Sequence, residues 1–569
     1  MSTDDPLATI LPGRPINVDS GSEACIELMR RWIHNCRTDH SDCVWQSDNP
    51  LPTRVVDVGS ESPHTDPFLL VTKGQIGEWI TLSHCWGGEM PLTTTVANLE
   101  HRRKGIRIED LPPTFRDAVT LTRKLGFQHI WIDSLCIVQD SHEDWTKEST
   151  QMHDIYARAS LNIAASSSKN PCHGIFASGN LERHLASPTI SLQSSSKAHN
   201  VEGTLHIRPS MFSDPFTHTE DEPLHKRAWV MQESILSSRR VDIGSSEVKW
   251  FCRSCTKREG FPGSEDGRGS GVPSHLRAGK NLLTVPLCKV PLDPTTNGIE
   301  LDGSGALSWW YSSLYRRYVR RGITMHKDIL PAIAGIAEKV AERTAYQYKA
   351  GLWLEDIHRG LLWQAIWSVS RSSETACPSW SWASMNLPWN GVRQLYLDTY
   401  EPGPRATILD VNVVNTAGNP FGEVISASLT MRGHYHALGH WMDERLPVYN
   451  TECLFNDMKL AHRGTNPREY VDCATAPPGR VICTLDERPT DVHEAHKRMK
   501  QRDVICMQIG KFGQYKSRGA RQKLGETIYA LLLESAGQES GEYIRIGIAE
   551  IPEEDGMADG WDLKTVTVV

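Results

Sequence analysis

A buried strand is predicted at Trp79-Ile80-Thr81-Leu82-Ser83-His84-Cys85-Trp86-Gly87-Gly88, where an apolar, β-prone run stops at reactive side chains and then at two glycines. A second run of the same design follows at His129-Ile130-Trp131-Ile132-Asp133-Ser134-Leu135-Cys136. The residues between them show an amphipathic helix pattern, and two strands joined by a helical crossover are almost always parallel. Both polar clusters should therefore emerge at one edge of a sheet, where open α/β folds place their binding sites.

The flanking segments extend this pattern into an α/β fold class with a parallel sheet. Three helices are expected, each marked by residues that favour helix ends. They span 22–36 after Ser22, 114–125 between Pro113 and Gly126, and a stretch that opens at Ser141 with Asp144 and continues to about 158. Strands are expected at 55–58, 68–71, 161–164, 239–243 and 247–252.

The chain has 569 residues, too many for one hydrophobic core, so several domains are expected. We predict an N-terminal extension (1–75) packed on the core, an α/β domain (76–255), a loop or linker (256–300), a helical segment (301–390) and a β-rich C-terminal domain (391–569). The helical patterns of the fourth segment lie at 305–321, 328–345 and 352–368, and residues 177–222 are expected to form a polar surface excursion.

Composition excludes several classes of protein. The formal net charge is -8 and no long basic stripe occurs, so nucleic acid is not the expected partner. No apolar segment approaches the length of a membrane span, and the N-terminus lacks the features of a signal peptide. We therefore expect a cytoplasmic protein, in which the 14 cysteines are reduced thiols or metal ligands rather than disulfides.

The two strand ends supply the first candidate catalytic residues, His84 and Asp133. Neighbouring strand residues point to opposite faces, so His84 and Cys85 cannot simply pair as base and nucleophile. A carboxylate fixes the tautomer and orientation of an imidazole, which favours a hydrogen bond between His84 and Asp133. In the alternative interpretation, Asp133 caps a loop and His84 satisfies buried backbone groups.

A third candidate is Glu233, which lies four residues after Trp229 and would share a helix face with it. A lone glutamate beside an aromatic ring can stabilise an oxocarbenium-like centre when a glycosidic bond breaks. The competing interpretation is a surface carboxylate paired with Arg239 or Arg240. Cys85 and Cys136 would be nucleophiles only if a neighbour lowered their pKa, and buried thiols are usually inert.

Two cysteine clusters raise the question of zinc. Cys36, His40 and Cys43 have ligand-like spacing, and Cys252 and Cys255 form a CxxC. Together they could supply four ligands, but no regular paired motif is present and some two hundred residues separate the clusters. The sequence therefore assigns no metal site. Gly87-Gly88 matches neither phosphate-binding glycine pattern, so no cofactor is firmly implied.

Five blocks of the chain resemble the fungal heterokaryon incompatibility (HET) domain. They are Leu82-Ser83-His84-Cys85-Trp86-Gly87, Leu111-Pro112-Pro113-Thr114-Phe115-Arg116-Asp117-Ala118, Trp131-Ile132-Asp133-Ser134-Leu135-Cys136-Ile137-Val138-Gln139-Asp140, Met152-His153-Asp154-Ile155-Tyr156 and Arg227-Ala228-Trp229-Val230-Met231-Gln232-Glu233. The flanks with Trp32-Ile33 and with Pro378-Ser379-Trp380-Ser381-Trp382-Ala383-Ser384 also look like what accompanies this domain. Ala228 departs mildly from the glycine often found before the tryptophan.

The resemblance implies a protein of fungal nonself recognition whose HET domain triggers programmed cell death. The family is also considered distantly similar to TIR domains, which self-assemble and in some members hydrolyse NAD with one glutamate. Carried over, Glu233 becomes that glutamate, with His84 and Asp133 lining the site. Ser83, Cys85, Trp86, Ser134 and Trp229 are then the residues expected to contact the substrate, NAD.

Three hypotheses follow from these residues and from the resemblance. The first is an NAD-cleaving effector of cell death. The second is a non-enzymatic signalling or assembly module that acts with an incompatibility partner protein, and with self-association, through the same polar edge. The third is a hydrolase that uses Cys85 or Cys136. In each, the β-rich C-terminal region is the candidate sensor.

Overall fold

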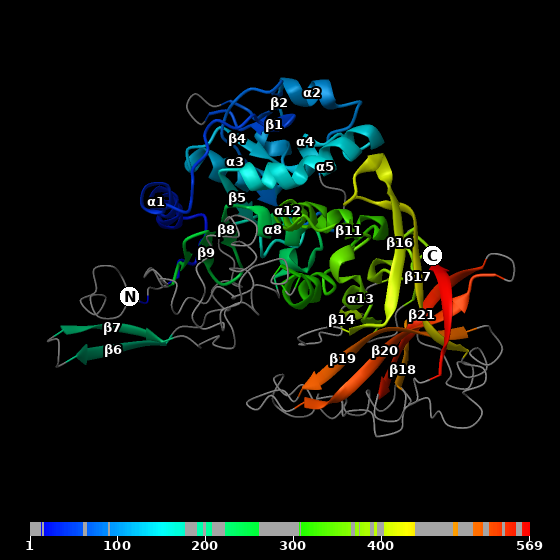
Figure 1. Cartoon of the computed structure of the whole chain (residues 1–569). Coiled ribbons are helices and arrows are strands. Elements are labelled where there is room, and N and C mark those ends of the chain that lie inside the picture. Colours follow the sequence, from blue (N-terminus) through cyan, green and yellow to red (C-terminus); the bar gives the residue numbers. More distant parts are fainter. Residues whose placement is uncertain are drawn as a thin grey trace. The chain divides into compact units, whose positions relative to one another are not determined.

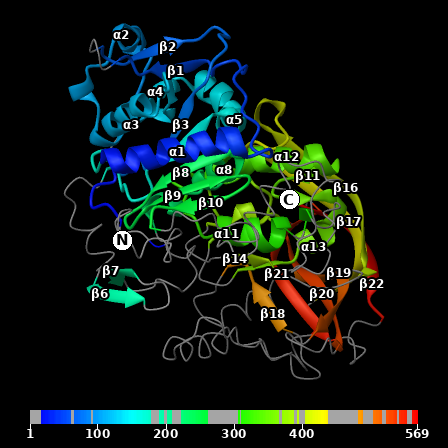
Figure 2. The same ribbon diagram turned by 90° about the vertical axis from the view of Figure 1, so that its left-hand side faces the viewer.

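The protein divides into two compact units, Met1–Pro291 and Leu292–Val569, which are described separately. The structure, a computed structural model, describes residues 13, 16–60, 65–88, 92–176, 190–196, 201–207, 222–260, 306–307, 309–365, 370–374, 376–386, 392–394, 403–437, 482–487, 504–515, 523–537, 541–552 and 560–569. Figures 1 and 2 show these residues in two views.

The N-terminal unit is built on an eight-stranded sheet in the order β10-β9-β8-β5-β3-β4-β1-β2 (Figure 1). Its strands are β1 (Arg54–Asp57), β2 (Phe68–Val71), β3 (Ile80–Ser83), β4 (His129–Trp131), β5 (Leu161–Ala164), β8 (Arg239–Ile243), β9 (Val248–Cys252) and β10 (Thr256–Arg258). The four central strands β8, β5, β3 and β4 are parallel, which confirms the parallel pairing predicted for the two strand ends. Antiparallel strands continue the sheet on both sides.

Helices begin and end where the local sequence predicts. Ser22 and Ser141 accept a hydrogen bond from a backbone N–H of the helices they cap, and Pro113 is the first residue of its helix. Gly126 follows that helix at φ +84°, a conformation that favours glycine. The helices of this unit are α1 (Glu23–Asp39), α2 (Leu99–Lys104), η2 (Ile108–Asp110), α3 (Pro113–Lys124), α4 (Asp133–Cys136), α5 (His142–Arg158), η3 (Pro223–Lys226) and α8 (Val230–Leu236).

Helices cover both faces of the sheet. Phe115 of α3 contacts the ring of His84, whereas Tyr156 of α5 and Glu233 of α8 interact with Ser83. Since successive side chains of a strand point to opposite faces, α3 lies on one face and α5 with α8 on the other. Helix α1 lies beside α3, because Arg30 donates a hydrogen bond to the carbonyl of Lys124 (Figure 2).

The order of the parallel strands creates a switch point between β3 and β5. From β3 the chain crosses through α3 to β4 on one side, and then through α5 to β5 on the other side of β3. The connection after β3 leads to β4 and the connection after β5 leads to β8 on the opposite side, so the two diverge between the carboxyl ends of β3 and β5. In open α/β sheets ligands bind at such a point, outside the carboxyl ends of the strands.

The polar excursion predicted at 177–222 contains one described hairpin, β6 (Ile190–Ser196) with β7 (Val201–Ile207). Its other residues, except residue 222, lie outside the described part of the chain. The same holds for most of the predicted linker, where only residues 256–260 are described and 256–258 form β10.

The C-terminal unit is rich in β-structure, as predicted. Its main sheet has the order β15-β19-β20-β21-β22-β17-β16, with β18 on β21, and β19 also pairs with β17 so that the strands close into a ring. The strands are β15 (Gly403–Pro404), β16 (Ala406–Asn415), β17 (Val424–Ala437), β18 (Ile482–Leu485), β19 (Val504–Tyr515), β20 (Lys523–Ser535), β21 (Glu542–Pro552) and β22 (Asp562–Val568). Two small sheets pair β11 (Tyr348–Lys349) with β12 (Leu352–Trp353), and β13 (Trp363–Ala365) with β14 (Val392–Gln394).

The helix predicted at 352–368 is wrong. The described residues there form β12, η8 (Leu354–Asp356), a four-residue helix α13 (Ile357–Gly360) and β13. The run is apolar throughout, and such a run does not distinguish a buried helix from buried short strands. The other helical patterns hold in part, as η5 (Trp310–Tyr315), α11 (Arg316–Tyr318), η6 (His326–Asp328), η7 (Pro331–Ile333) and α12 (Ala334–Thr344).

Aromatic side chains form much of the C-terminal core. The rings of Trp310, Tyr348 and Trp353 meet edge to face, a favoured aromatic geometry. Ser379, from the tryptophan-rich motif, donates its backbone N–H to the carbonyl of Val569 and accepts a hydrogen bond from the backbone N–H of Arg545. This motif is therefore held against β21 and the end of β22. Among the described residues, no helix is both long enough and apolar enough to cross a membrane.

Candidate functional site

The polar side chains of β3 and of the segment after β4 meet at the switch point. Nδ1 of His84 lies 3.7 Å from Oδ1 of Asp133, which is longer than a hydrogen bond. Asp133 instead accepts hydrogen bonds from Nε1 of Trp86 at 2.8 Å and from the backbone N–H of Ser134 at 2.7 Å. The hydrogen bond predicted between His84 and Asp133 is therefore not formed. Asp133 organises the start of α4, as the alternative interpretation expected.

His84 is buried without a hydrogen bond at one ring nitrogen. The residue is 2% exposed, and within the described chain its Nε2 has no hydrogen-bond partner. Burial lowers the pKa of His84 to about 4, and Arg227 acts in the same direction while Asp133 opposes it. The imidazole is therefore neutral at physiological pH and presents one unsatisfied nitrogen, which is costly to bury.

Glu233 is the second buried group of the site. The residue is 5% exposed and, among the described atoms, its Oε2 has no hydrogen-bond partner. Burial raises the pKa of Glu233 to about 7, although Arg227 and hydrogen bonding from Ser83 and Tyr156 act against the rise. The surface alternative fails, because Glu233 is buried and Arg240 pairs with Asp242. A carboxyl group with this pKa exchanges a proton readily near neutral pH.

Two residues of this site carried no predicted role. Arg227 donates a hydrogen bond to the carbonyl of His84, and its charge affects the pKa values of His84, Cys85 and Glu233. Tyr156 donates a hydrogen bond to the carbonyl of Leu82 at 3.3 Å. Both lie in sequence blocks that resemble the HET domain, and this resemblance could have marked them as candidate site residues.

The remaining predicted contact residues surround this centre unevenly. Ser83 accepts a hydrogen bond from Nδ2 of Asn162 at 3.0 Å, and Oγ of Ser134 is buried without a partner among the described residues. Cys85 packs in a small apolar cluster with Leu224 and Val230. Trp229 precedes α8, and its carbonyl accepts the backbone N–H of Glu233. Ser83 and Ser134 thus offer polar atoms at the switch point, whereas Cys85 packs among apolar side chains.

Neither cysteine at the strand ends is activated. Both thiols are buried, and burial raises the pKa of Cys85 and raises that of Cys136 to about 12. Since the thiolate is the nucleophilic form, both groups are unreactive in this conformation.

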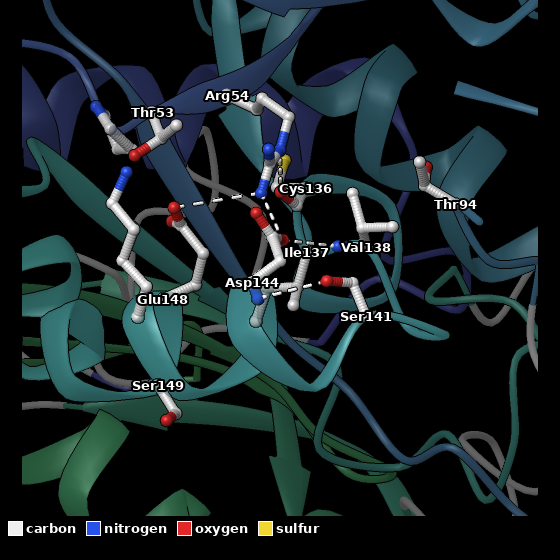
Figure 3. Close-up of polar contacts among 12 residues, drawn as sticks. Thr53, Arg54, Thr94, Cys136, Ile137, Val138, Ser141, Asp144, Glu148 and Ser149 are labelled. Atoms are coloured by element: carbon white, nitrogen blue, oxygen red, sulfur yellow. Dashed lines mark hydrogen bonds and ion pairs between the residues drawn. The ribbon is translucent and has the colours of Figure 1, made fainter. Parts of the chain in front are cut away.

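A buried ionic brace fixes the segment that carries Asp133 (Figure 3). Arg54 of β1 donates a hydrogen bond from Nε to the carbonyl of Cys136 at 2.6 Å and from Nη2 to Asp144 at 2.5 Å. Glu148 lies 3.7 Å from the same Nη2, is 0% exposed and has its pKa raised by burial. Asp144 also accepts the backbone N–H of Val138 at 2.8 Å. The brace therefore holds the C-terminal end of α4 and the residues after it against β1 and α5.

The glycine turn after β3 has a steric requirement. Gly87 has φ +70°, and a Cβ added there would lie 2.5 Å from Cβ of Asn170. Only glycine satisfies both the backbone conformation and the close approach. The turn lets the chain leave the strand directly after Trp86.

The two cysteine clusters, separated in sequence, come together in space. Ligand atoms of Cys36, His40, Cys43 and Cys252 all lie within 4.8 Å of one another. They lie where α1 contacts β9, apart from the switch point. The long sequence separation of the two clusters is therefore compatible with one common metal site.

These features define the class of the N-terminal unit, a doubly wound α/β domain with a buried polar site at its switch point. Residues 79–233 match the model of the family described as Heterokaryon incompatibility protein (HET), which confirms the resemblance for that part of the chain. The matched range ends at Glu233. No curated protein and no solved structure matches the chain.

Glu233→Gln should change how stability depends on pH. The pKa of Glu233 is about 7 in the fold against 4.5 ordinarily, so its contribution favours folding below pH 4.5 and is lost as pH rises through 7. The full difference is roughly 3 kcal/mol. Denaturant unfolding of the N-terminal unit should show that the wild type loses stability relative to Glu233→Gln as the pH rises from roughly 5 to roughly 8. Parallel pH profiles for the two proteins would contradict the prediction.

Proposed function

We propose that the chain is a fungal nonself-recognition protein whose HET domain triggers programmed cell death by cleaving the nicotinamide glycosidic bond of NAD. The HET match implies a function related to heterokaryon incompatibility. The observation that supports a catalytic role is Glu233, a buried carboxyl group with a pKa of about 7 and an unsatisfied oxygen at the switch point. Perturbed carboxyl groups of this kind are typical of catalytic sites.

The proposed reaction needs few protein groups. The bond between the anomeric carbon and the nicotinamide nitrogen breaks, and its electron pair leaves with nicotinamide. Water then adds to the oxocarbenium-like ribosyl centre, and ionised Glu233 stabilises that centre and accepts the proton of the water. Near pH 7 the carboxyl group is partly ionised, which suits a base. Asp133 adds negative charge near the site.

His84 and the neighbouring polar groups are assigned to positioning and binding. Its neutral ring offers an unsatisfied Nε2 at the edge of β3. We propose that this atom and the hydroxyls of Ser83 and Ser134 bind the ribose, while Trp86 and Trp229 provide aromatic surface. The unsatisfied buried atoms His84 Nε2, Ser134 Oγ and Glu233 Oε2 support this assignment.

The burial of the site favours a second candidate, a non-enzymatic signalling module. Glu233 is 5% exposed and His84 is 2% exposed, so a substrate would reach them only after a local opening. In this alternative the polar edge stabilises an assembly interface with an incompatibility partner or a second copy. The cysteine-dependent hydrolase is not proposed, because burial keeps both strand-end thiols protonated.

The proposal also includes the domain boundaries and the localisation predicted from the sequence. The HET domain would occupy 76–255 and be TIR-like, with residues 1–75 as an extension packed on it. A linker at 256–300 would lead to a helical segment at 301–390 and a sensor at 391–569. We propose a cytoplasmic site of action.

NAD consumption by the purified full-length chain at high concentration tests the first candidate. Wild type should consume NAD, and Glu233→Gln should lose at least roughly 100-fold in rate, the usual contribution of a general acid or base. Cys85→Ser, Cys136→Ser and the exposed Glu143→Gln should retain activity, with folding checked by circular dichroism.

Expression of the same variants in a fungal host separates the two candidates. If Glu233→Gln alone abolishes both cell death and the consumption of NAD, the result supports the enzyme. Death that persists in Glu233→Gln without NAD loss would reject the enzyme and support the signalling module.

A further inference from the structure

Three sulfur atoms and one imidazole converge beside the sheet of the N-terminal unit. Cys36 and His40 are one helical turn apart on and just after α1, Cys43 follows, and Cys252 is the last residue of β9. Their ligand atoms all lie within 4.8 Å of one another. Cys36, Cys43 and Cys252 are buried, and His40 is half-buried. Zinc prefers four nitrogen and sulfur ligands in this number and combination.

The spacing fits a tetrahedron around a zinc ion. With Zn–S bonds of about 2.3 Å, ligand sulfurs of a tetrahedral site lie about 3.8 Å apart. Sγ of Cys252 lies 3.5 Å from Nδ1 of His40, and the ligand atoms of all four residues lie within 4.8 Å of one another. Cys255 lies beside this set, with its Sγ 3.7 Å from Sγ of Cys252 and 3.8 Å from Nε2 of His40. A disulfide needs about 2.05 Å between sulfurs, so these distances suit a shared ion and not a bond.

Each sulfur of the set has its own polar neighbour, as expected for metal-bound thiolates. Sγ of Cys36 accepts a hydrogen bond from Nε of Arg239 at 3.3 Å. Sγ of Cys252 accepts the backbone N–H of Cys255 at 3.3 Å, and the hydroxyl of Ser254 lies 3.3 Å from Sγ of Cys43. Such outer contacts orient ligands and stabilise their charge.

The surrounding charge complements a thiolate-rich zinc centre. Three thiolates and one neutral imidazole give a zinc site a net charge of about −1. The guanidinium of Arg239 lies next to the cluster and also donates a hydrogen bond to the carbonyl of Cys43 at 2.6 Å. It stacks on the ring of Trp45 at 4.3 Å, which fixes its position. Thiolates would give this buried cation a counter-charge, which neutral thiols would not.

We propose that Cys36, His40, Cys43 and Cys252 bind one structural zinc ion, with Cys255 beside the site but not among its four ligands. The ion would join α1 to the β9–β10 edge of the sheet, across more than two hundred residues of sequence. Binding free energy of such a site is folding free energy. The ion would therefore anchor the N-terminal helix and has no part in the chemistry proposed at Glu233.

Metal content of the full chain, purified without a histidine tag and measured by inductively coupled plasma mass spectrometry, tests the proposal. We expect about one zinc per chain, as for a closed structural site. Cys36→Ser and Cys252→Ser should lose the metal. Cys25→Ser, a buried cysteine on the same helix α1, is the matched control and should keep it. Arg239→Gln should bind zinc roughly 10- to 100-fold more weakly.

A second measurement keeps the test valid if the ligand variants do not fold. Wild-type protein treated with a chelator should show faster alkylation of the cluster cysteines than untreated protein, and added cobalt should give the visible spectrum of tetrahedral thiolate coordination. Absence of zinc together with alkylation unchanged by the chelator would overturn the proposal. Zinc retained in both Cys36→Ser and Cys252→Ser would also overturn it.

Discussion

Arg545→Met is expected to destabilise the C-terminal unit by about 3–5 kcal/mol, the usual cost of breaking a buried ion pair. Arg545 is 0% exposed and pairs with Asp486, with N–O distances of 3.0 Å and 3.1 Å. It also donates hydrogen bonds to the carbonyls of Leu361 and Trp363, each at 2.6 Å. One guanidinium thus joins β21, the turn after β18 and the chain around α13.

The cost arises because Asp486 stays behind without a partner. Burial already raises the pKa of Asp486, and losing the arginine would raise it further. Arg545→Met with Asp486→Leu should recover much of the stability, since replacing both partners removes the isolated charge. Lys339→Met, which breaks the exposed ion pair with Glu342 on α12, is the control and should cost less than about 1 kcal/mol.

Hydrogen exchange is the measurement of choice, because a chain with two units need not unfold in one step. Protection should fall in β18–β21 and change little in the N-terminal sheet. Equal protection in wild type and Arg545→Met would show that the pair contributes nothing to this unit.

Arg54→Met should destabilise the N-terminal unit by a similar amount, about 3–5 kcal/mol. The substitution leaves the half-buried Asp144 and the fully buried Glu148 beside each other without their cation, and it removes the donor to the carbonyl of Cys136. The difference in the free energy of unfolding between wild type and Arg54→Met should become smaller at acidic pH, because both carboxyl groups become protonated when they lack a counter-charge.

Three variants test this explanation for Arg54. Arg54→Met with Glu148→Gln should be more stable than Arg54→Met, because one buried charge is removed. Arg107→Met disrupts exposed ion pairs with Glu109 and Asp110 and should cost less than about 1 kcal/mol. Denaturant unfolding followed by tryptophan fluorescence would measure all three. A loss of stability for Arg54→Met as small as that for Arg107→Met would reject the explanation.

Local signals predicted much of the N-terminal fold. Ser22, Pro113, Ser141 and Gly126 marked helix ends correctly, because caps act within one turn of the backbone. The two strand ends were also placed correctly at one edge, since a helical crossover leaves little choice of direction. The apolar run at 352–368 was misassigned, because its short strands and turns depend on distant packing partners.

The site could be predicted only in outline. His84, Asp133 and Glu233 were recognised, but the distances between them depend on tertiary packing. Asp133 accepts a hydrogen bond from Trp86 in place of the one expected from His84. Burial was the largest unpredicted factor. It changes the character of Glu233 from a surface carboxylate to a group that titrates near pH 7.

The position of α8 after β5 has a consequence for synthesis on the ribosome. Strands β3, β4 and β5 emerge first and already carry His84 and Asp133, whereas Glu233 follows on a later segment. That segment leads directly into β8, which pairs with β5. A nascent chain therefore holds an incomplete site until the last parallel strand has left the exit tunnel, so any activity that needs Glu233 appears only once this part of the chain is finished.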